Sequence, residues 1–318
     1  MLKLLAKSAR FASFEITSES PYREEVPYKV YLNGELVSED ARNIQTLYGL
    51  SPNTEYVLEV QGVGESLHFT TESEDFTLNV RDFGAIGDGQ TDDTQAIQAA
   101  LYTCPPDSRV LIPAGTYRFT SLYFKSNTRV ELAKGATLLA IESRQERAIL
   151  PGMIRNYRGG KYYLGSWEGN PLDCFAGLLN LIDVENVVLY GEGVLEANGS
   201  KEGFWHNPKV KNLAWRPRSV FMRRVKQVSL IGITIKNSPA WTVHPMESQN
   251  LKFINTSIQN PWDSPNTDGI NPESCDGVEI LGCHFSLGDD CIAIKSGKIY
   301  MARALGIPSQ NLKIRNCF

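Results

Sequence analysis

Short apolar runs with a common pattern recur along the second half of the chain. Each run opens on Asn, Gln or Gly and has apolar second and fourth residues, and it occurs at residues 186–189, 227–230, 250–253, 277–280 and 311–314. From Val228 the equivalent residues are Leu251, Val278 and Leu312, in steps of 23, 27 and 34 residues. A repeat of this length with insertions of variable size is typical of a solenoid.

Each repeat holds two further short strands and no segment of helix length. The second strands begin at Gly232, Asn255 and Gly282, and the third at Trp241, Gly269 and Ile292. Three short strands per repeat predict an all-β chain, a right-handed parallel β-helix over residues 76–318.

Three carboxylates stand at the start of third strands. Asp268-Gly-Ile and Asp290-Cys-Ile occupy the same position one coil apart, so the two residues stack at about 4.8 Å. Strand alternation would place Asp289 and Asp290 on opposite faces, and we therefore expect a bend at Gly288. Carboxylates held this close repel one another and raise the pKa of at least one of them. A purely structural role would not require this crowding.

Two motifs carry a family resemblance. Asn266-Thr267-Asp268 and Gly288-Asp289-Asp290 resemble the marks of the polygalacturonase family, the family-28 glycoside hydrolases, in its bacterial, often exo-acting branch. The resemblance covers residues 76–318 and implies an inverting hydrolase of α-1,4-galacturonosyl bonds in pectic oligo- or polysaccharides, with no cofactor and no metal. It implies that Asp289 is the general acid and that Asp268 and Asp290 hold the attacking water.

The remaining candidates bind substrate. Asn266 would position the sugar or the water, as the resemblance implies. A galacturonate carboxylate would pair with Lys or Arg, for which Lys295 is the first candidate and Arg216 and Arg218 are weaker ones. His244, one coil before Asn271, would face the cleft or pack in the core.

Three other functions stay open. A hydrolase of rhamnogalacturonan or xylogalacturonan would use the same triad. A calcium-dependent pectate lyase would share the solenoid but need a metal cluster and a basic proton acceptor. A non-catalytic β-helix module would not require the triad.

Composition and charge narrow the class of partner. With 42% hydrophobic residues, 21% charged residues and a net charge of −4, the chain can bury a core but has no basic stripe for nucleic acid. The sequence contains no run of 18 apolar residues, so it predicts no membrane-spanning helix. The oligomeric state is not predicted.

The first residues and the cysteines bear on the compartment. Residues 1–16 contain no apolar stretch long enough for a secretory signal. The six cysteines include Cys275, Cys283 and Cys291, which we interpret as buried thiols because zinc ligands are usually closer in sequence. Free thiols favour a reducing, cytoplasmic location, or an extracellular one if a preceding segment is missing.

Residues 1–75 predict a separate small β-sandwich. Short alternating strands are separated by turns, and Asn33-Gly34 is typical of a hairpin. The segment from Leu50 to Tyr56 resembles the fibronectin type III signature, in which a tyrosine hydroxyl caps the turn. We expect a spacer or packing role.

The solenoid opens on an acidic segment. Asp88, Asp92 and Asp93 resemble a calcium cluster, but we favour capping of a helix that begins at Thr94 and covers the open end of the coils. The aromatic insertion at residues 159–171 would wall a cleft and favour release of single sugars from a chain end.

The chain stops within a coil. No His-Gly dipeptide occurs, and no Arg-x-Lys motif follows Asp290, where the family has one. The strand at 311–314 has no second or third strand after it. We expect a C-terminally truncated, poorly soluble and nearly inactive fragment of a longer enzyme.

Overall fold

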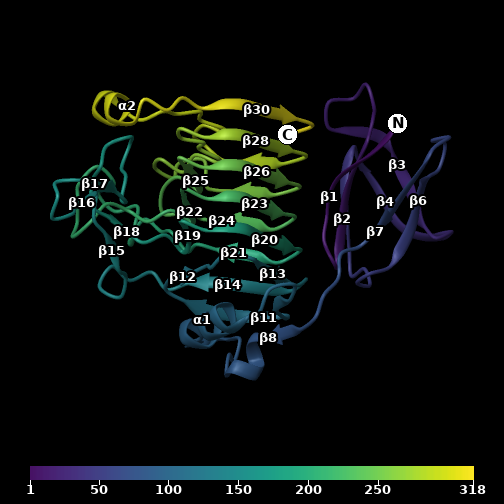
Figure 1. The fold of residues 1–318 in the computed structure, drawn as a ribbon, viewed down its shortest axis with the longest axis horizontal. Helices are drawn as coiled ribbons and strands as arrows, with labels where there is room; N and C mark the ends of the chain where they lie inside the picture. The colour runs from purple at the N-terminus through teal and green to yellow at the C-terminus, as the bar shows by residue number, and fades with distance from the viewer.

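Parallel sheets stacked as a β-helix form most of the molecule. The computed structural model describes residues 1–318, and Figure 1 shows the strands piled in successive coils. The first sheet contains β8 (Thr77–Asn79), β10 (Arg109–Ile112), β13 (Thr128–Leu132), β20 (Glu185–Gly191), β23 (Lys226–Ile231), β26 (Gln249–Ile254), β28 (Asp276–Leu281) and β30 (Gln310–Arg315).

Two further sheets complete the coils. The second contains β9 (Asp88–Asp92), β11 (Gly115–Phe119), β14 (Ala136–Ala140), β21 (Val194–Glu196), β24 (Thr234–Lys236), β27 (Ser257–Gln259) and β29 (His284–Ser286). The third contains β12 (Leu122–Tyr123), β19 (Leu179–Ile182), β22 (Val220–Arg223) and β25 (Val243–Met246). The predicted fold class, mostly β with a parallel solenoid, is therefore confirmed.

The register between coils is the one that the repeat predicts. Val228 pairs with Leu251, Leu251 with Val278, and Val278 with Leu312. In the third strands Val243 pairs with Ile270 and Ile270 with Ile292, as isolated bridges. Equivalent residues of neighbouring coils therefore lie side by side.

The polar residue that opens each repeat has a conformational role. Asn127, Asn186, Gln227, Asn250 and Asn311 all have φ between 54° and 56°. This left-handed region is strained for most residues but accessible to Asn, which explains why Asn recurs where these strands begin.

The interior of the coils is one apolar core of 41 buried residues, to which alternate positions of the strands contribute. The helix α1 (Thr94–Thr103) adds Ile97, Ala100 and Leu101 to this core and lies at the end of the stack (Figure 1). The predicted helix and its covering role are confirmed.

The carboxylates of the acidic segment before α1 accept hydrogen bonds from backbone N–H groups. Asp92 accepts a hydrogen bond from the backbone N–H of Thr94 at 2.9 Å, and Asp93 accepts from the N–H groups of Ile86 and Gly87. Asp88 accepts from the N–H groups of Gln90 and Thr91. The N-cap residue is Asp93, whose side chain makes no capping bond, whereas Asp92, one residue earlier, binds the first N–H of the helix.

Residues 2–70 fold into two antiparallel sheets. One has the order β1 (Leu2–Lys7), β2 (Phe11–Ile16), β5 (Ile44–Tyr48), and the other β4 (Glu35–Arg42), β3 (Arg23–Leu32), β6 (Glu55–Val60), β7 (Ser66–Thr70). Their facing sides enclose a separate core of ten buried residues. The backbone N–H of Ser51 donates to the Tyr56 hydroxyl at 2.9 Å, which is the contact expected at this turn.

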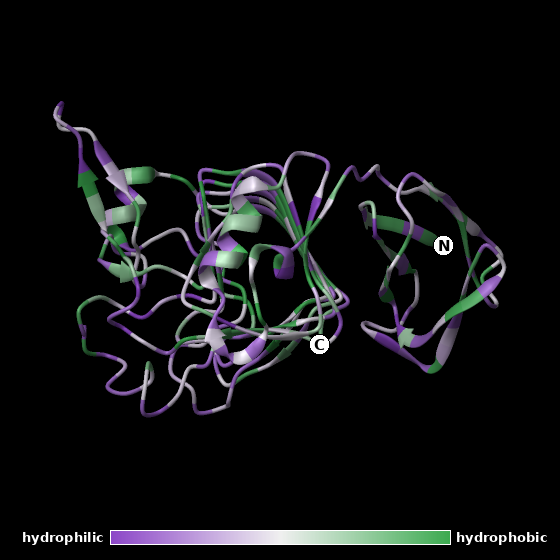
Figure 2. Ribbon diagram, turned by 90° about the horizontal axis from the view of Figure 1, so that it is seen from below, coloured by the Kyte–Doolittle hydropathy of each residue, from purple (hydrophilic) through white to green (hydrophobic).

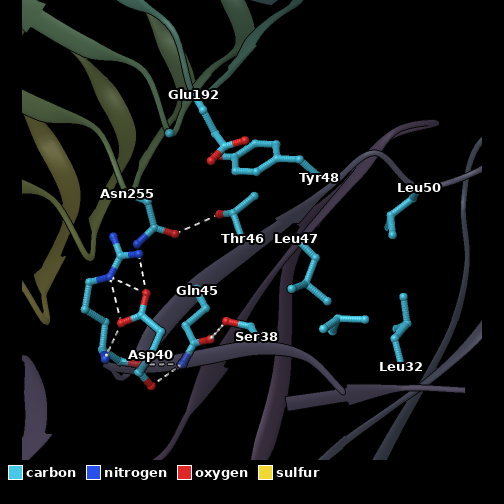
Figure 3. Close-up of a pocket in the computed structure, with 13 residues that line it drawn as sticks. Leu32, Ser38, Asp40, Gln45, Thr46, Leu47, Tyr48, Leu50, Glu192 and Asn255 are labelled. Carbon is cyan, nitrogen blue, oxygen red and sulfur yellow. Dashed lines mark hydrogen bonds and ion pairs between the residues drawn. The ribbon is translucent and has the colours of Figure 1, made fainter. Parts of the chain in front are cut away.

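This sandwich is docked on the outer face of the first sheet. Phe11 and Ile44 pack against Tyr190, Ile231, Ile254 and Leu281, one residue from each of four successive strands. Seen from the α1 end, the sandwich lies on one side of the coils and the long insertions lie on the other (Figure 2). A cavity of about 500 Å³ remains beside this interface, where Thr46 donates to Asn255 at 2.7 Å (Figure 3).

Two smaller features complete the fold. The insertion between β14 and β19 forms two short antiparallel pairs, β15 (Ile149–Leu150) with β18 (Cys174–Phe175) and β16 (Met153–Arg155) with β17 (Lys161–Tyr163). The helix α2 (Ile299–Leu305) follows the third strand of the last complete coil. Neither α1 nor α2 has the length and apolar character needed to cross a bilayer.

All six cysteines are free thiols. Cys275 and Cys283 are buried as predicted, but Cys291 is exposed because it lies in the open segment after Asp290. The prediction of buried thiols is wrong for Cys291.

Candidate functional site

Three carboxylates meet on one side of the solenoid. Asp268 lies two residues before Ile270 and Asp290 two residues before Ile292, and these isoleucines pair across neighbouring coils. The backbone N–H of Gly269 donates to the carbonyl of Asp290 at 2.9 Å. One oxygen from each of Asp268, Asp289 and Asp290 lies within 4.8 Å of one from each of the others. The predicted triad is therefore assembled.

The bend that brings Asp289 to this site occurs where it is expected. The chain bends at Gly288 and Asp289, immediately after the second strand of the coil. A Cβ atom on Gly288 would lie 1.8 Å from the carbonyl oxygen of Trp262. Only glycine permits this close approach, so Gly288 determines where the triad closes.

The triad is asymmetric in burial. Asp268 is 4% exposed, whereas Asp289 and Asp290 are both exposed. Burial raises the pKa of Asp268, and the Asp289 carboxylate raises it further, against the opposing effects of Asn271 and Lys295. The sequence predicts a raised pKa for at least one of the three carboxyl groups, and the raised pKa is that of Asp268, the buried member of the triad.

Neighbouring donors stabilise the ionised form of Asp268. Asn271 donates to Asp268 Oδ2 at 2.9 Å, and Lys295 Nζ lies 3.6 Å from the same oxygen. Lys295 Nζ also lies 4.4 Å from the centre of the Trp241 ring. Lys295 is thus held beside the triad between a carboxylate and an aromatic face, where the sequence places it.

A cleft of about 540 Å³ opens over the triad. It combines acidic, basic and aromatic side chains from four segments of the chain. Its lining residues are Glu168, Gly169, Trp241, Asn266, Asp268, Glu273, Asp289, Ile294, Lys295, Ser296, Gly297 and Lys298. Of the predicted substrate-binding residues, Asn266 and Lys295 reach this cleft.

Arg216 and Arg218 lie behind the cleft wall. Each is 3% exposed, and burial lowers the pKa of Arg216 to about 10. Arg216 donates to the side-chain oxygen of Asn266 at 2.6 Å, and Arg218 donates to the carbonyls of Arg216 and Ser166. Both guanidinium groups lie over the Trp167 ring. Arg216 thus contacts Asn266, a residue that lines the cleft, and neither arginine lines the cleft itself.

His244 is also inside the wall. It is fully buried, and its Nε2 lies 2.7 Å from Glu273 Oε2. Burial lowers the pKa of His244; for Glu273 the hydrogen bond and nearby cations outweigh burial and lower the pKa. The His244 Nε2 atom and Glu273 are thus hydrogen-bond partners, and His244 Nδ1 has no partner.

Sequence reasoning missed several residues of the site. Asn271 and Glu273 continue the third strand after Asp268, so the repeat could have found them. Glu168 comes from the insertion after β17 and pairs with Lys298 at 3.1 Å, across 130 residues. No local pattern signals that contact.

The same three carboxylates are the group whose oxygens lie near enough to share a metal ion. Exposed acidic groups commonly occur without one, and here Lys295 already supplies a positive charge to Asp268. The cluster has the donors of an acid–base site.

The parallel β-helix carries clustered carboxylates on its side, next to a cation and an aromatic ring. Such a site has the acid and base groups that a polysaccharide-processing protein needs. The comparisons identify the family within this class: the chain belongs to glycosyl hydrolases family 28, whose model matches residues 109–314. A model described as rhamnogalacturonase A/epimerase, pectate lyase-like, matches residues 77–133.

Named relatives lie in the same group. A probable polygalacturonase of Vitis vinifera is 32% identical over 244 residues, which cover 74% of this chain and 47% of that protein. The structure of a Thermotoga maritima exopolygalacturonase superposes with TM-score 0.62 at 27% identity, covering 76% of this chain and 59% of the other. The chain spans about half the length of the curated relatives it matches.

A third likeness extends to the N-terminal sheets. The family 28 exopolygalacturonase of Yersinia enterocolitica superposes with TM-score 0.68 at 24% identity, covering 92% of this chain and 65% of that one. At this identity the likeness shows the fold alone.

Proposed function

We propose that this chain carries the catalytic centre of an inverting hydrolase that cleaves α-1,4-galacturonosyl bonds of pectic oligo- or polysaccharides from a chain end. The observation that carries the proposal is that oxygens of Asp268, Asp289 and Asp290 lie within 4.8 Å of one another, with Asp268 and Asp289 lining an open cleft, in a chain of family 28. Hydrolysis of a glycosidic bond needs one acid and one base on either side of it. Three carboxylates in one site can supply both.

Asp289 is assigned as the proton donor because it is exposed in the cleft and can reach a leaving oxygen. The competing donor is Asp268, whose pKa is raised. Its contacts favour the ionised form, since Asn271 donates to it and Lys295 lies nearby. Asp268 and Asp290 would therefore hold and deprotonate the attacking water.

The inverting outcome is taken from the family and not from the distance between carboxylates. Inverting enzymes usually separate the two carboxyl groups by about 6.5–9.5 Å, to leave room for water. The oxygens here lie within 4.8 Å of one another. We propose that Asp268 and Asp290 share the water and that Asp289 acts on the sugar side.

Recognition of the acidic sugar falls to Lys295. It lines the cleft, and the buried Trp241 ring, 4.4 Å from its ammonium group, holds that group in place. Asn266 would contact the sugar or the water, held in place by Arg216. We propose positioning roles for Arg216, Arg218 and His244, because all three are buried.

The chain-end mode is supported by two observations. The Thermotoga maritima protein whose structure superposes on this chain is an exopolygalacturonase. In this chain Gly169 and Lys298 are joined by a backbone hydrogen bond, so that the insertion and the segment before α2 meet at one side of the cleft. Such a wall limits how far a polymer can extend.

We also propose that residues 1–75 form a fibronectin type III-like domain and residues 76–318 the catalytic β-helix. The strand orders β1-β2-β5 and β4-β3-β6-β7 and the Tyr56 contact support the first assignment. Its packing on four strands of the solenoid supports a structural role.

Product analysis on a panel of pectic oligosaccharides tests the proposal. Oligogalacturonates should yield free galacturonate and new reducing ends, with no unsaturated sugar and no loss of rate in a chelator. Unsaturated products that depend on calcium would show a lyase. Cleavage restricted to rhamnogalacturonan or xylogalacturonan would show that the proposed substrate is wrong and the proposed role of the triad is right.

A further inference from the structure

We propose that Trp167 is a positioning residue for the carboxylate site, whose ring holds Asn266 and Lys295 in place through two buried arginines. The inference rests on the proposed function and adds to it a residue that does not line the cleft. Trp167 belongs to the insertion between β14 and β19 and is 6% exposed. It reaches both cleft residues through a chain of side-chain contacts.

A tight turn carries Trp167 into the wall. Trp167 and Asn170 exchange two backbone hydrogen bonds, of 2.9 and 3.0 Å. Glu168 and Gly169 between them have φ of 46° and 71°, as in a two-residue hairpin loop. Lys298 fixes the tip of this turn, because its backbone N–H donates to the Gly169 carbonyl and its ammonium group pairs with Glu168. The turn therefore holds Trp167 in one position.

Two buried positive charges lie against the Trp167 ring. The guanidinium centres of Arg216 and Arg218 lie 5.2 and 4.8 Å from the ring centre. Their hydrogen bonds go to carbonyl oxygens and to the Asn266 side chain, and none goes to a carboxylate. A buried cation without a carboxylate is costly, and the negative face of an indole offsets part of that cost. Loss of the ring would therefore displace both guanidinium groups.

Arg216 connects Trp167 to the Asn-Thr-Asp motif. Its Nη1 donates to the carbonyls of Pro239 and Pro265 at 2.8 and 2.7 Å. Its Nη2 donates to the side-chain oxygen of Asn266 at 2.6 Å. The donors of a guanidinium group have fixed directions in one plane. The position of Arg216 on the Trp167 ring therefore determines how the Asn266 amide is oriented.

Arg218 connects Trp167 to Lys295. The Arg218 guanidinium and the Lys295 ammonium lie 5.0 and 4.4 Å from the centre of the buried Trp241 ring. Lys295 Nζ in turn lies 3.6 Å from Asp268 Oδ2. A displacement of Arg218 would change the packing of Trp241. It would thereby move the ammonium group that stabilises the ionised form of Asp268.

The first test removes the aromatic ring and keeps an apolar side chain, in Trp167→Leu. With trigalacturonate as substrate, kcat/KM should fall about 10- to 100-fold, because small displacements of reacting groups cost rate steeply. Trp167→Phe keeps an aromatic face and should recover most of this loss. Wild-type kcat/KM in Trp167→Leu would overturn the proposal.

Trp215→Leu is the matched control. Trp215 stacks on Trp167 with ring centres 4.8 Å apart and belongs to the same apolar cluster. Its replacement should keep kcat/KM within about threefold, because the contacts of Trp167 with both arginines remain. Equal losses in Trp215→Leu and Trp167→Leu would show that only the packing of the cluster matters, and would overturn the positioning role.

Fluorinated tryptophans incorporated at position 167 test the ring without changing its shape, and they apply even where Trp167→Leu fails to fold. Fluorine weakens the negative potential on the face of the indole, and with it the attraction for a guanidinium group. We expect kcat/KM to fall stepwise as the number of fluorine atoms on Trp167 increases. A rate that does not depend on fluorination would overturn the proposal.

A signal from Lys295 separates this inference from the proposed function. Reductive methylation with isotope-labelled formaldehyde gives each lysine an NMR signal, and Lys295→Arg assigns that of Lys295. The nearby Trp241 ring should shift this signal away from those of exposed lysines, and the shift should shrink in Trp167→Leu but persist in Trp215→Leu.

The combined results distinguish the two proposals. If the Lys295 signal behaves in this way and no oligogalacturonate is hydrolysed, the positioning role stands and the hydrolase proposal fails. If hydrolysis occurs, and Trp167→Leu keeps both the shifted signal and the wild-type kcat/KM, the hydrolase proposal stands and the positioning role fails.

Discussion

The first sheet and the third strands of the solenoid use one register to stack opposite kinds of side chain. Along the first sheet Val228, Leu251 and Val278 lie one above another, and each is at most 1% exposed. Along the third strands the same step places Asp268 beside Asp290. The apolar stack gains free energy from burial, whereas the carboxylate stack costs free energy through repulsion. A solenoid can therefore hold charges together because its core supplies the stability.

The substitution with the largest expected effect disrupts the carboxylate stack and leaves the apolar core unchanged. Asp289→Asn removes the proton donor, and kcat on oligogalacturonate should fall by about 10²–10⁴-fold, the usual contribution of a general acid. The temperature of unfolding should stay the same, because Asp289 is exposed.

Asp276→Asn is the matched control for this variant. Asp276 lies at the start of β28, between the two motifs in sequence, and pairs with Gln310 and Asn311. Its replacement should leave kcat within about twofold. A similar loss of rate in both variants, or retention of more than about a tenth of the rate by Asp289→Asn, would contradict the assignment.

The next variant breaks the apolar stack instead. Ile280 is fully buried in β28 and pairs with Phe253 and Ile314 in the neighbouring coils. Ile280→Ala should lower the free energy of unfolding by about 2–5 kcal/mol, through lost burial and the cavity left behind.

Chemical denaturation measures the Ile280 effect, and kcat of the folded fraction should change little. A loss of kcat as large as in Asp289→Asn, without loss of stability, would show that the two stacks do not have separate roles.

The smallest effect concerns the pH dependence of stability. The folded-state pKa of Asp268 is raised by burial, so the folded protein binds this proton more tightly than the unfolded chain does. The contribution of Asp268 to stability is fully present below the unfolded pKa of about 3.9 and is lost as the pH rises through the folded pKa.

Denaturation of wild type and Asp268→Asn across this pH range checks the direction of the effect. The free energy of unfolding of the wild type, relative to that of the variant, should decline as the pH rises from the unfolded pKa of Asp268 to its folded pKa. The slope in that range has an upper limit of about 1.4 kcal/mol per pH unit, the value for one whole proton. A difference that grows with pH would show instead that Asn271 and Lys295 outweigh burial.

The parts of the structure that repeat were predictable from the sequence. Residues such as Asn250 adopt the left-handed conformation where a strand begins, and their recurrence in the sequence marks each coil. Counting coils in this way aligns Asp268 with Asp290. The bend at Gly288 followed from strand alternation. These features depend only on local conformation and on the step between coils.

The parts that depend on insertions were not predictable. Arg216 and Arg218 have the sequence context of loop residues, but Trp167 from another insertion lies over both and buries them. The pKa of Asp268 depends on how one coil is covered, which no local pattern reports. Contacts between insertions of variable length have no period from which to infer them.

The central claim is that the stacked triad hydrolyses a galacturonosyl bond by direct attack of water. Proton NMR of trigalacturonate digestion, read in the first minutes, tests it most directly through the anomer of the new reducing end. We predict that the β-anomer appears first and that the α-anomer follows only by mutarotation, and that Asp289→Asn produces neither. Initial release of the α-anomer, or of an unsaturated sugar, would contradict the account.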